Sequence, residues 1–236
     1  MIKERFDKII ATQFNVSRKD ARQSIRKGLA LVDGQVVKEP SLVLDVESEI
    51  TFCGKKLEFK QFVYILMNKP KGVISASSDN NKKTVVDLVP PELKRNGLFP
   101  VGRLDKDTTG LLIITDDGDF AHKAISPKNN VYKTYIASLD GEVTQQMVES
   151  FAEGITLADG TVCRKAFLTP LDEKRAQIKI CEGKYHQIKR MFGTVGLGVN
   201  ELERVAFGDL KLPQGLKQGQ CIALKSQEIS LIFAKS

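Results

Sequence analysis

Short apolar segments separated by turn residues run through this chain of 236 residues and limit it to folds made of short strands and helices. Residues 30–32 and 111–114 are examples of these segments. A membrane-spanning helix needs about 20 consecutive apolar residues, so the sequence predicts none. Residues 1–5 mix acidic and basic side chains, and no apolar block follows them. We therefore expect no secretory signal and a cytoplasmic location.

The composition is that of an ordinary globular protein, with 42% hydrophobic and 28% charged residues. It excludes the disordered and fibrous classes, and the length fits one large domain or two unequal ones. The four cysteines form no C-x-x-C pair, and only two histidines accompany them. We expect free thiols in a reducing compartment and no metal site.

The net charge of +7 favours a polyanionic partner, and the charge is unevenly distributed. Residues 1–27 hold eight Lys or Arg and three Asp or Glu, a net charge of +5. Residues 28–59 hold three Lys or Arg and six Asp or Glu, a net charge of −3. The basic excess therefore falls on the first segment of the chain.

A small separate module is predicted at the start of the sequence. Apolar residues at helical spacing predict a helix over residues 3–13. Ser17 begins an S-x-x-D signal and is the expected N-cap of a second helix that ends at Gly28. Asp33 and Gly34, between short apolar stretches, predict a hairpin turn.

The second predicted helix carries a set of basic side chains, which are Arg18, Lys19, Arg22 and Arg26. Arg18, Arg22 and Arg26 are spaced by four residues and share one helix face, where like charges repel. A phosphate ligand would relieve this repulsion, and a solvated helix face is the ordinary alternative. With the hairpin, these helices resemble the S4 RNA-binding fold. The resemblance implies that residues 1–59 form an RNA-binding module whose helices contact the RNA.

Residues 60–236 are predicted to form a larger domain in which strand-like runs recur and few helical patterns appear. The expected strands are residues 63–67, 73–76, 111–115, 131–139, 160–168, 175–181 and 199–207. The expected helices are residues 119–125, 144–151 and 186–195. This pattern predicts an α+β fold with a mostly antiparallel sheet.

The densest polar cluster occupies residues 102–110, between an apolar stretch and a predicted strand. It carries Arg103, Asp105, Lys106 and Asp107, and two glycines bracket it, which predicts a tight loop. A loop at a sheet edge is a common place for a catalytic group. A charged surface turn is the ordinary alternative.

Two further clusters follow along the chain. Lys133 and Tyr135 share one face of a predicted strand, where a tyrosine usually packs in the core. Residues 182–192 begin a predicted helix with several basic side chains, which oppose the helix dipole at that end. An anionic substrate or a facing carboxylate would resolve this conflict. His186, in the same segment, is expected to be a hydrogen-bonded structural histidine.

The three clusters occur in the order of a known set of motifs. These are G-R-L-D followed by G-L at residues 102–111, K-x-Y at residues 133–135, and G-x-x-x-Q-[IV]-[KR]-R at residues 183–190. Residues 66–73 are similar to the motif that precedes them. On these residues the chain resembles the RsuA-like family of pseudouridine synthases, over nearly its whole length. The resemblance implies the pseudouridine synthase fold for the larger domain.

The resemblance also implies the reaction. The enzyme breaks the N1–C1′ bond of a uridine, turns the uracil and rejoins it through C5. Asp105 is the implied catalytic carboxylate, by attack on C1′ or by removal of the C2′ proton, and both routes stay open. A nearby cation favours the ionised carboxylate. Lys189 is the implied partner of Asp105, with Arg190 and Arg103 as alternatives.

Other side chains are implied to hold the RNA. Tyr135 is expected to stack on the flipped uracil or to accept a proton at C5, with Ile188 as an apolar floor. Arg103 is expected to fill the stack that the base leaves or to hold a phosphate. The expected RNA path comprises Lys69, Lys71, Lys106, Lys184 and Arg190. These cations would contribute affinity more than base choice.

The RNA itself is suggested by short stretches such as residues 184–187, which are similar to the branch that modifies 16S ribosomal RNA. Related large-subunit enzymes usually carry Asn where this chain has Tyr185. The implied target is one uridine of 16S rRNA (uridine 516 in the standard rRNA numbering), in free RNA or in a small-subunit assembly intermediate. A 23S rRNA target and a non-catalytic RNA-binding or assembly factor are the alternatives. The chemistry needs no cofactor or metal, and we expect a monomer without membrane contact.

Overall fold

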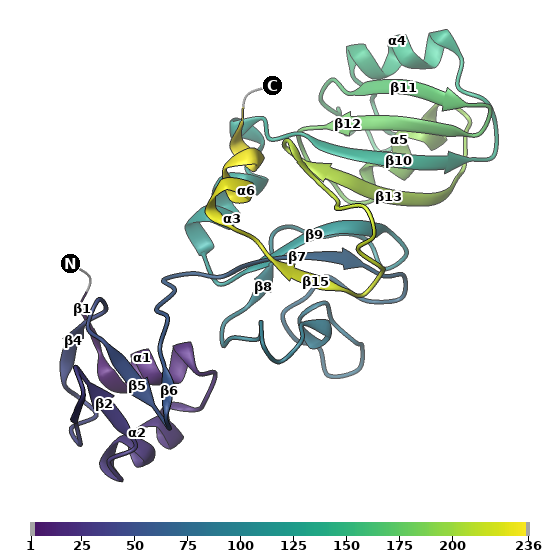
Figure 1. Ribbon diagram of the computed structural model, residues 1–236. Coiled ribbons are helices and arrows are strands. Elements are labelled where there is room, and N and C mark those ends of the chain that lie inside the picture. The colour runs from purple at the N-terminus through teal and green to yellow at the C-terminus, as the bar shows by residue number, and fades with distance from the viewer. Residues whose placement is uncertain (1–2, 235–236) are drawn as a thin grey trace. The chain divides into compact units, whose positions relative to one another are not determined.

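The computed structural model describes residues 3–234, which divide into two compact units (Figure 1). The first unit comprises Met1–Val63 and Lys94–Gly97, and the second comprises Tyr64–Leu93 and Leu98–Ser236. The functional division at residues 59 and 60 stays a prediction. None of the helices within residues 3–234 is long and apolar enough to span a membrane.

The first unit contains two helices, α1 (Phe6–Gln13) and α2 (Arg18–Arg26). Its strands are β1 (Lys3–Arg5), β2 (Ala30–Val32), β3 (Gln35–Val36), β4 (Val43–Asp45), β5 (Ile50–Phe52) and β6 (Lys55–Lys56). The order β3-β2-β5-β6 forms one sheet, and β1 pairs with β4 in another. The core between helices and sheet includes Phe6, Ile10, Ile25 and Ile50, each buried completely.

Local signals account for the ends of these elements. The Ser17 hydroxyl accepts a hydrogen bond from the Asp20 amide at 3.1 Å, which confirms the predicted N-cap. Asp33 and Gly34 both have positive φ, as a two-residue hairpin turn between β2 and β3 requires. The first helix begins at Phe6 instead of residue 3, because β1 pairs with β4.

The second unit is built on a nine-stranded sheet. Its main order is β11-β12-β10-β13-β9-β7-β15, with β14 paired to β13 and β8 paired to β9. The strands are β7 (Tyr64–Lys69), β8 (Phe99–Pro100), β9 (Thr109–Thr115), β10 (Lys133–Leu139), β11 (Phe167–Asp172), β12 (Arg175–Ile180), β13 (Val199–Phe207), β14 (Leu210–Lys211) and β15 (Cys221–Ala223). The β9–β13 pair is parallel and the other pairs are antiparallel. The sheet is therefore mostly antiparallel, as predicted.

Four helices accompany this sheet: α3 (Gly118–Ile125), α4 (Gln145–Glu153), α5 (Gln187–Thr194) and α6 (Ser226–Ser230). Single 3₁₀ turns occur at Val86–Leu88, Pro127–Asn129 and Leu231–Phe233. Helix α4 packs on β11 (Figure 1). Ala124 of α3 belongs to the same buried core cluster as Leu66 of β7, Ile113 of β9 and Phe207 of β13. The three predicted helices of this unit are confirmed as α3, α4 and α5.

Two predicted strands are wrong. Residues 73–76 form only an isolated bridge between Ile74 and Thr84, and residues 160–166 precede the strand that starts at Phe167. In the second segment the Cys163 amide bonds to the Ile155 carbonyl, within a local turn. Apolar alternation does not reveal whether a neighbouring strand is available, so both segments read as strands in the sequence.

Candidate active site and RNA-binding face

Asp105 lies in the loop between β8 and β9, and glycines with positive φ stand at both ends of this loop. Gly102 has φ +78° and Gly110 has φ +97°. A Cβ atom at Gly110 would lie 2.3 Å from the Arg204 carbonyl oxygen, because β9 approaches β13 closely there. Only glycine can therefore bring the loop into the sheet at this point.

Lys69, at the end of β7, donates hydrogen bonds to the backbone of this loop. Its ammonium group is fully buried. It donates to the carbonyl oxygens of Pro70 (3.1 Å), Asp105 (3.1 Å), Lys106 (3.3 Å) and Thr108 (2.9 Å). Burial lowers the pKa of Lys69 to about 8. The expectation that Lys69 lines the RNA path is wrong. Its ammonium group is buried and bonded to carbonyl oxygens of the loop, so RNA cannot reach it.

The segment after β7 supports the same loop. The Gly72 amide donates to the Lys106 carbonyl at 2.8 Å. The Ser75 hydroxyl donates to the Leu104 carbonyl at 2.9 Å and accepts from the Leu104 amide at 3.0 Å. Backbone atoms on both sides of Asp105 are thereby fixed, while its side chain stays 31% exposed.

His186 is the residue that the structure brings to the Asp105 carboxylate. Its Nε2 lies 3.5 Å from Asp105 Oδ1, and its side chain is 39% exposed. It precedes α5 in the left-handed conformation, with φ 46° and ψ 35°. Sequence reasoning treated His186 as structural, and no pattern in the sequence distinguishes the two roles.

Lys189 pairs with Asp107 instead of Asp105, so the expected partnership is wrong in this structure. This ion pair lowers the pKa of Asp107. The two carboxylates are two residues apart on the loop, and each faces a different side chain, Asp105 the His186 ring just before α5 and Asp107 the Lys189 ammonium group on α5. That geometry depends on the fold and not on the spacing in the sequence.

The other basic side chains near the start of α5 also form ion pairs with carboxylates. Arg190 Nη2 lies 2.5 Å from Asp159 Oδ2, and Lys184 Nζ lies 3.6 Å from Glu182 Oε2. The facing-carboxylate resolution of the dipole conflict is therefore confirmed. Lys71 likewise pairs with Glu201 at 2.8 Å, whereas Arg103 and Lys106 are exposed on the loop.

Tyr135 and Ile188 are buried beside this region, with exposed fractions of 8% and 4%. Tyr135 on β10 is opposite Arg204 on β13, which in turn is opposite Gly110 on β9. Neighbouring strands are about 4.8 Å apart, so the Tyr135 backbone lies about 10 Å from the start of β9. The sheet thus carries Tyr135 to the region into which the Asp105 loop runs.

Tyr185 lies on the solvent side of the same site. Its ring stacks on the His186 ring with centroids 3.9 Å apart and planes 19° apart. The side chain is nevertheless 76% exposed. Among residues 3–234, no group of three or more His, Cys, Asp or Glu side chains is arranged to hold a metal ion.

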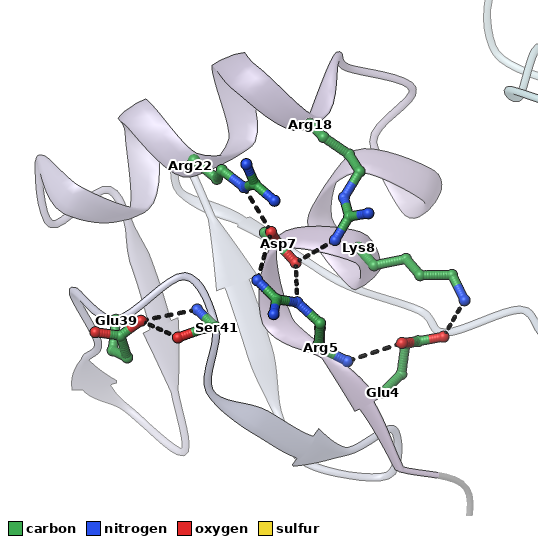
Figure 2. A network of polar contacts seen from close by, with 8 residues as sticks. All are labelled: Glu4, Arg5, Asp7, Lys8, Arg18, Arg22, Glu39 and Ser41. Carbon is green, nitrogen blue, oxygen red and sulfur yellow. Dashed lines mark hydrogen bonds and ion pairs between the residues drawn. The ribbon is translucent and has the colours of Figure 1, made fainter.

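In the first unit, the basic side chains Arg18, Lys19, Arg22 and Arg26 are all exposed on α2. Arg18 and Arg22 do not simply repel each other, as the sequence suggested. Both donate to the carboxylate of Asp7 on α1 (Figure 2). The chain itself therefore supplies the anion that relieves the repulsion, and the unit presents an ordered cationic face.

The second unit thus presents a partly exposed carboxylate on a loop of a mixed sheet, and the first unit presents exposed basic side chains on α2. Residues 63–194 match the family described as RNA pseudouridylate synthase, and residues 4–50 match the S4 domain. The chain belongs to the RNA pseudouridylate synthase family and is therefore an isomerase.

Several relatives are similar over nearly the whole chain. An uncharacterized RNA pseudouridine synthase of Bacillus subtilis is 37% identical, covering 97% of this chain and 98% of the relative. Ribosomal small subunit pseudouridine synthase A of Escherichia coli is 35% identical, covering 97% and 99%. Ribosomal large subunit pseudouridine synthase B of Bacillus subtilis is 37% identical, covering 98% and 96%. A crystal structure of a pseudouridylate synthase is 35% identical with a TM-score of 0.68, covering 97% of this chain and 99% of that one.

Proposed function

We propose that the protein converts one uridine of 16S ribosomal RNA, uridine 516 in the standard rRNA numbering, to pseudouridine. The observation that carries the catalytic assignment is the Asp105 carboxylate. It is 31% exposed and faces His186, and its backbone is held by Lys69. Such a fixed and accessible carboxylate suits attack at a sugar carbon or removal of a sugar proton.

Both routes begin with Asp105 ionised and the target base outside its stack. In the first, the carboxylate attacks C1′, and the N1–C1′ electron pair leaves with the uracil. The turned uracil then attacks C1′ through C5 and displaces the carboxylate. In the second, Asp105 removes the C2′ proton as the uracil leaves, giving a glycal. C5 then bonds to C1′, and the proton returns to C2′.

Both routes end with loss of the proton from C5 and its return to the ring nitrogen. Tyr135 is our candidate for accepting the C5 proton, and Ile188 for the apolar wall beside the uracil. His186 takes the place expected of Lys189, as the side chain that faces the Asp105 carboxylate at 3.5 Å. Lys189 forms an ion pair with Asp107, and we place this pair at the rim of the site.

The proposed RNA path uses the exposed Arg103 and Lys106 on the loop. It also uses the ion-paired cations Lys71, Lys184 and Arg190, which exchange a carboxylate for a phosphate on binding. We propose that the S4 module adds the side chains of α2. The protein is proposed to act as a cytoplasmic monomer on rRNA or on a small-subunit assembly intermediate.

Support for 16S rRNA comes from relatives of the small-subunit type and from Tyr185 in the third motif. A 23S target is the second candidate, because a large-subunit synthase is 37% identical. Overall identity does not separate the two, since the small-subunit relatives are 35% identical.

The test is pseudouridine mapping on unmodified 16S and 23S transcripts and on partial ribosomal particles. Asp105→Asn should abolish the modification and keep RNA binding. Asp107→Asn is the matched comparison, because it removes a carboxylate two residues away and should reduce the modification far less than Asp105→Asn. One new pseudouridine at uridine 516 supports the proposal. A site in 23S rRNA keeps the chemistry and overturns the target, and tight binding without modification of any RNA overturns the catalytic assignment.

A further inference from the structure

A fully buried carboxylate lies among three arginines in the first unit (Figure 2). Asp7, in the first turn of α1, accepts four N–H groups. Oδ1 accepts from Arg5 Nε at 3.1 Å and Arg18 Nη2 at 3.1 Å. Oδ2 accepts from Arg5 Nη2 at 3.2 Å and Arg22 Nε at 2.7 Å. Each oxygen therefore has two donors, and the carboxylate is satisfied.

The cluster keeps Asp7 charged despite its burial. Burial raises the pKa of Asp7, but hydrogen bonds from Arg5, Arg22 and Arg18 outweigh this effect and hold its pKa well below the usual value. One negative charge faces three positive charges, so the cluster carries a net charge of +2.

The arginines remain open to a second anion. Their side chains are 42% (Arg5), 50% (Arg18) and 45% (Arg22) exposed. Each guanidinium has five N–H donors, and Asp7 engages four of the fifteen. Arginine binds phosphate through paired N–H groups in a fixed plane, so the orientation of that plane decides whether the pair can form.

We infer that Asp7 is a positioning residue for RNA binding, which fixes the guanidinium planes of Arg18 and Arg22 so that their free N–H groups bind backbone phosphates. This inference rests on the proposed RNA-binding role of the module. Without Asp7 the two like charges on α2 repel each other and the side chains sample many rotamers. With Asp7 they are ordered before RNA arrives, and binding does not have to order them.

The direction in which Asp7→Asn changes the RNA affinity separates this role from a simple effect of charge. Asp7→Asn removes a negative charge close to the RNA, so charge alone predicts tighter binding. The positioning role predicts weaker binding, because an amide accepts from the arginines less strongly and turns an N–H group toward them. The two explanations therefore give opposite results for the same variant.

The experiment measures the dissociation constant of the full-length protein for unmodified 16S and 23S transcripts at about 0.1 M salt, with the folded state of each variant checked by circular dichroism. Asp7→Asn should weaken binding to the preferred transcript at least fivefold. Glu4→Gln is the matched control, because it also removes a carboxylate of this segment, and Glu4 bonds to the Lys8 ammonium group and the Arg5 backbone amide instead of the guanidinium groups that hold Asp7. Its binding should stay unchanged or tighten.

A double-mutant cycle excludes a purely structural role. In an Arg18→Gln, Arg22→Gln background, Asp7→Asn should cause no further loss of binding. A further loss there, or unchanged or tighter binding by Asp7→Asn alone, overturns the inference.

If Asp7→Asn fails to fold, the Arg22→Lys variant tests the inference instead. It keeps the positive charge and loses the Nε donor to Asp7. It should weaken binding several-fold, and more than Arg26→Lys, which also keeps the charge on the same helix but loses no bond to Asp7. Equal binding by these two variants overturns the inference. Because binding is measured without the reaction, failure to form pseudouridine affects the proposed function alone.

Discussion

Asp105 and Asp107 lie two residues apart in the loop between β8 and β9, and each faces a different side chain. Lys189 and His186 are three residues apart on the same segment, and they face different carboxylates of the loop. The lysine reaches Asp107, and the histidine faces Asp105. A functional assignment here therefore has to start from which side chain faces the Asp105 carboxylate.

His186→Gln should slow pseudouridine formation about tenfold or more, corresponding to about 1.4 kcal/mol of transition-state stabilisation. The physical reason is the loss of the imidazole that faces Asp105 at 3.5 Å. Lys189→Gln is the comparison, with a smaller effect on the single-turnover rate. A larger loss in Lys189→Gln than in His186→Gln would contradict this ordering.

Lys69→Met should reduce the free energy of unfolding of the second unit by about 1–3 kcal/mol, because it leaves buried carbonyl oxygens of the catalytic loop without a donor. The rate of modification should fall with it, since the backbone of Asp105 is no longer held. Lys71→Met is the control in urea unfolding: its ammonium group forms an exposed pair with Glu201 and contributes within about 0.5 kcal/mol. Equal stability of the two variants would rule out the anchoring role.

At the level of elements, helices and tight turns follow local signals, while strands depend on their neighbours. Ser17 and the Asp33, Gly34 turn act on adjacent residues, and both are confirmed. Residues 73–76 have strand-like composition, yet Ser75 bonds to the Leu104 backbone and the segment supports the loop that carries Asp105. The error lies in pairing, which a sequence pattern does not contain.

The ion cluster between α1 and α2 gives the first unit a defined acid sensitivity. The native pKa of Asp7 lies below its ordinary value of 3.8. Its contribution to stability is therefore complete above that value and is lost as the pH falls further toward the native pKa. Acid titration of the unfolding free energy should show a drop that starts near pH 4 and that is smaller in Asp7→Asn. A pH profile identical in the two proteins would contradict it.

For the whole molecule, the main consequence of the charge distribution is dependence on salt. If four or more of the proposed cations contact phosphates of unpaired RNA, the logarithm of the binding constant should fall with the logarithm of salt concentration with a slope of about −3 or steeper. Filter binding between about 50 and 200 mM salt measures this slope. A flat dependence would remove the proposed RNA path.

The sequence by itself determined the family, the presence of a small module before a larger domain, and the motif that contains Asp105. Those features rest on residues close together in the chain, such as the motif at residues 102–111. The basic character of α2 was equally visible.

Only the tertiary structure decided what each charge does. It buried Lys69 beneath the loop, directed Lys189 to Asp107, brought His186 to Asp105 and placed Asp7 among three arginines. An ion pair forms between groups that folding brings within about 4 Å, and its partners here come from strands, loops and helices far apart in the chain. The resemblance therefore supplied candidate residues, and packing determined which charged groups lie beside one another.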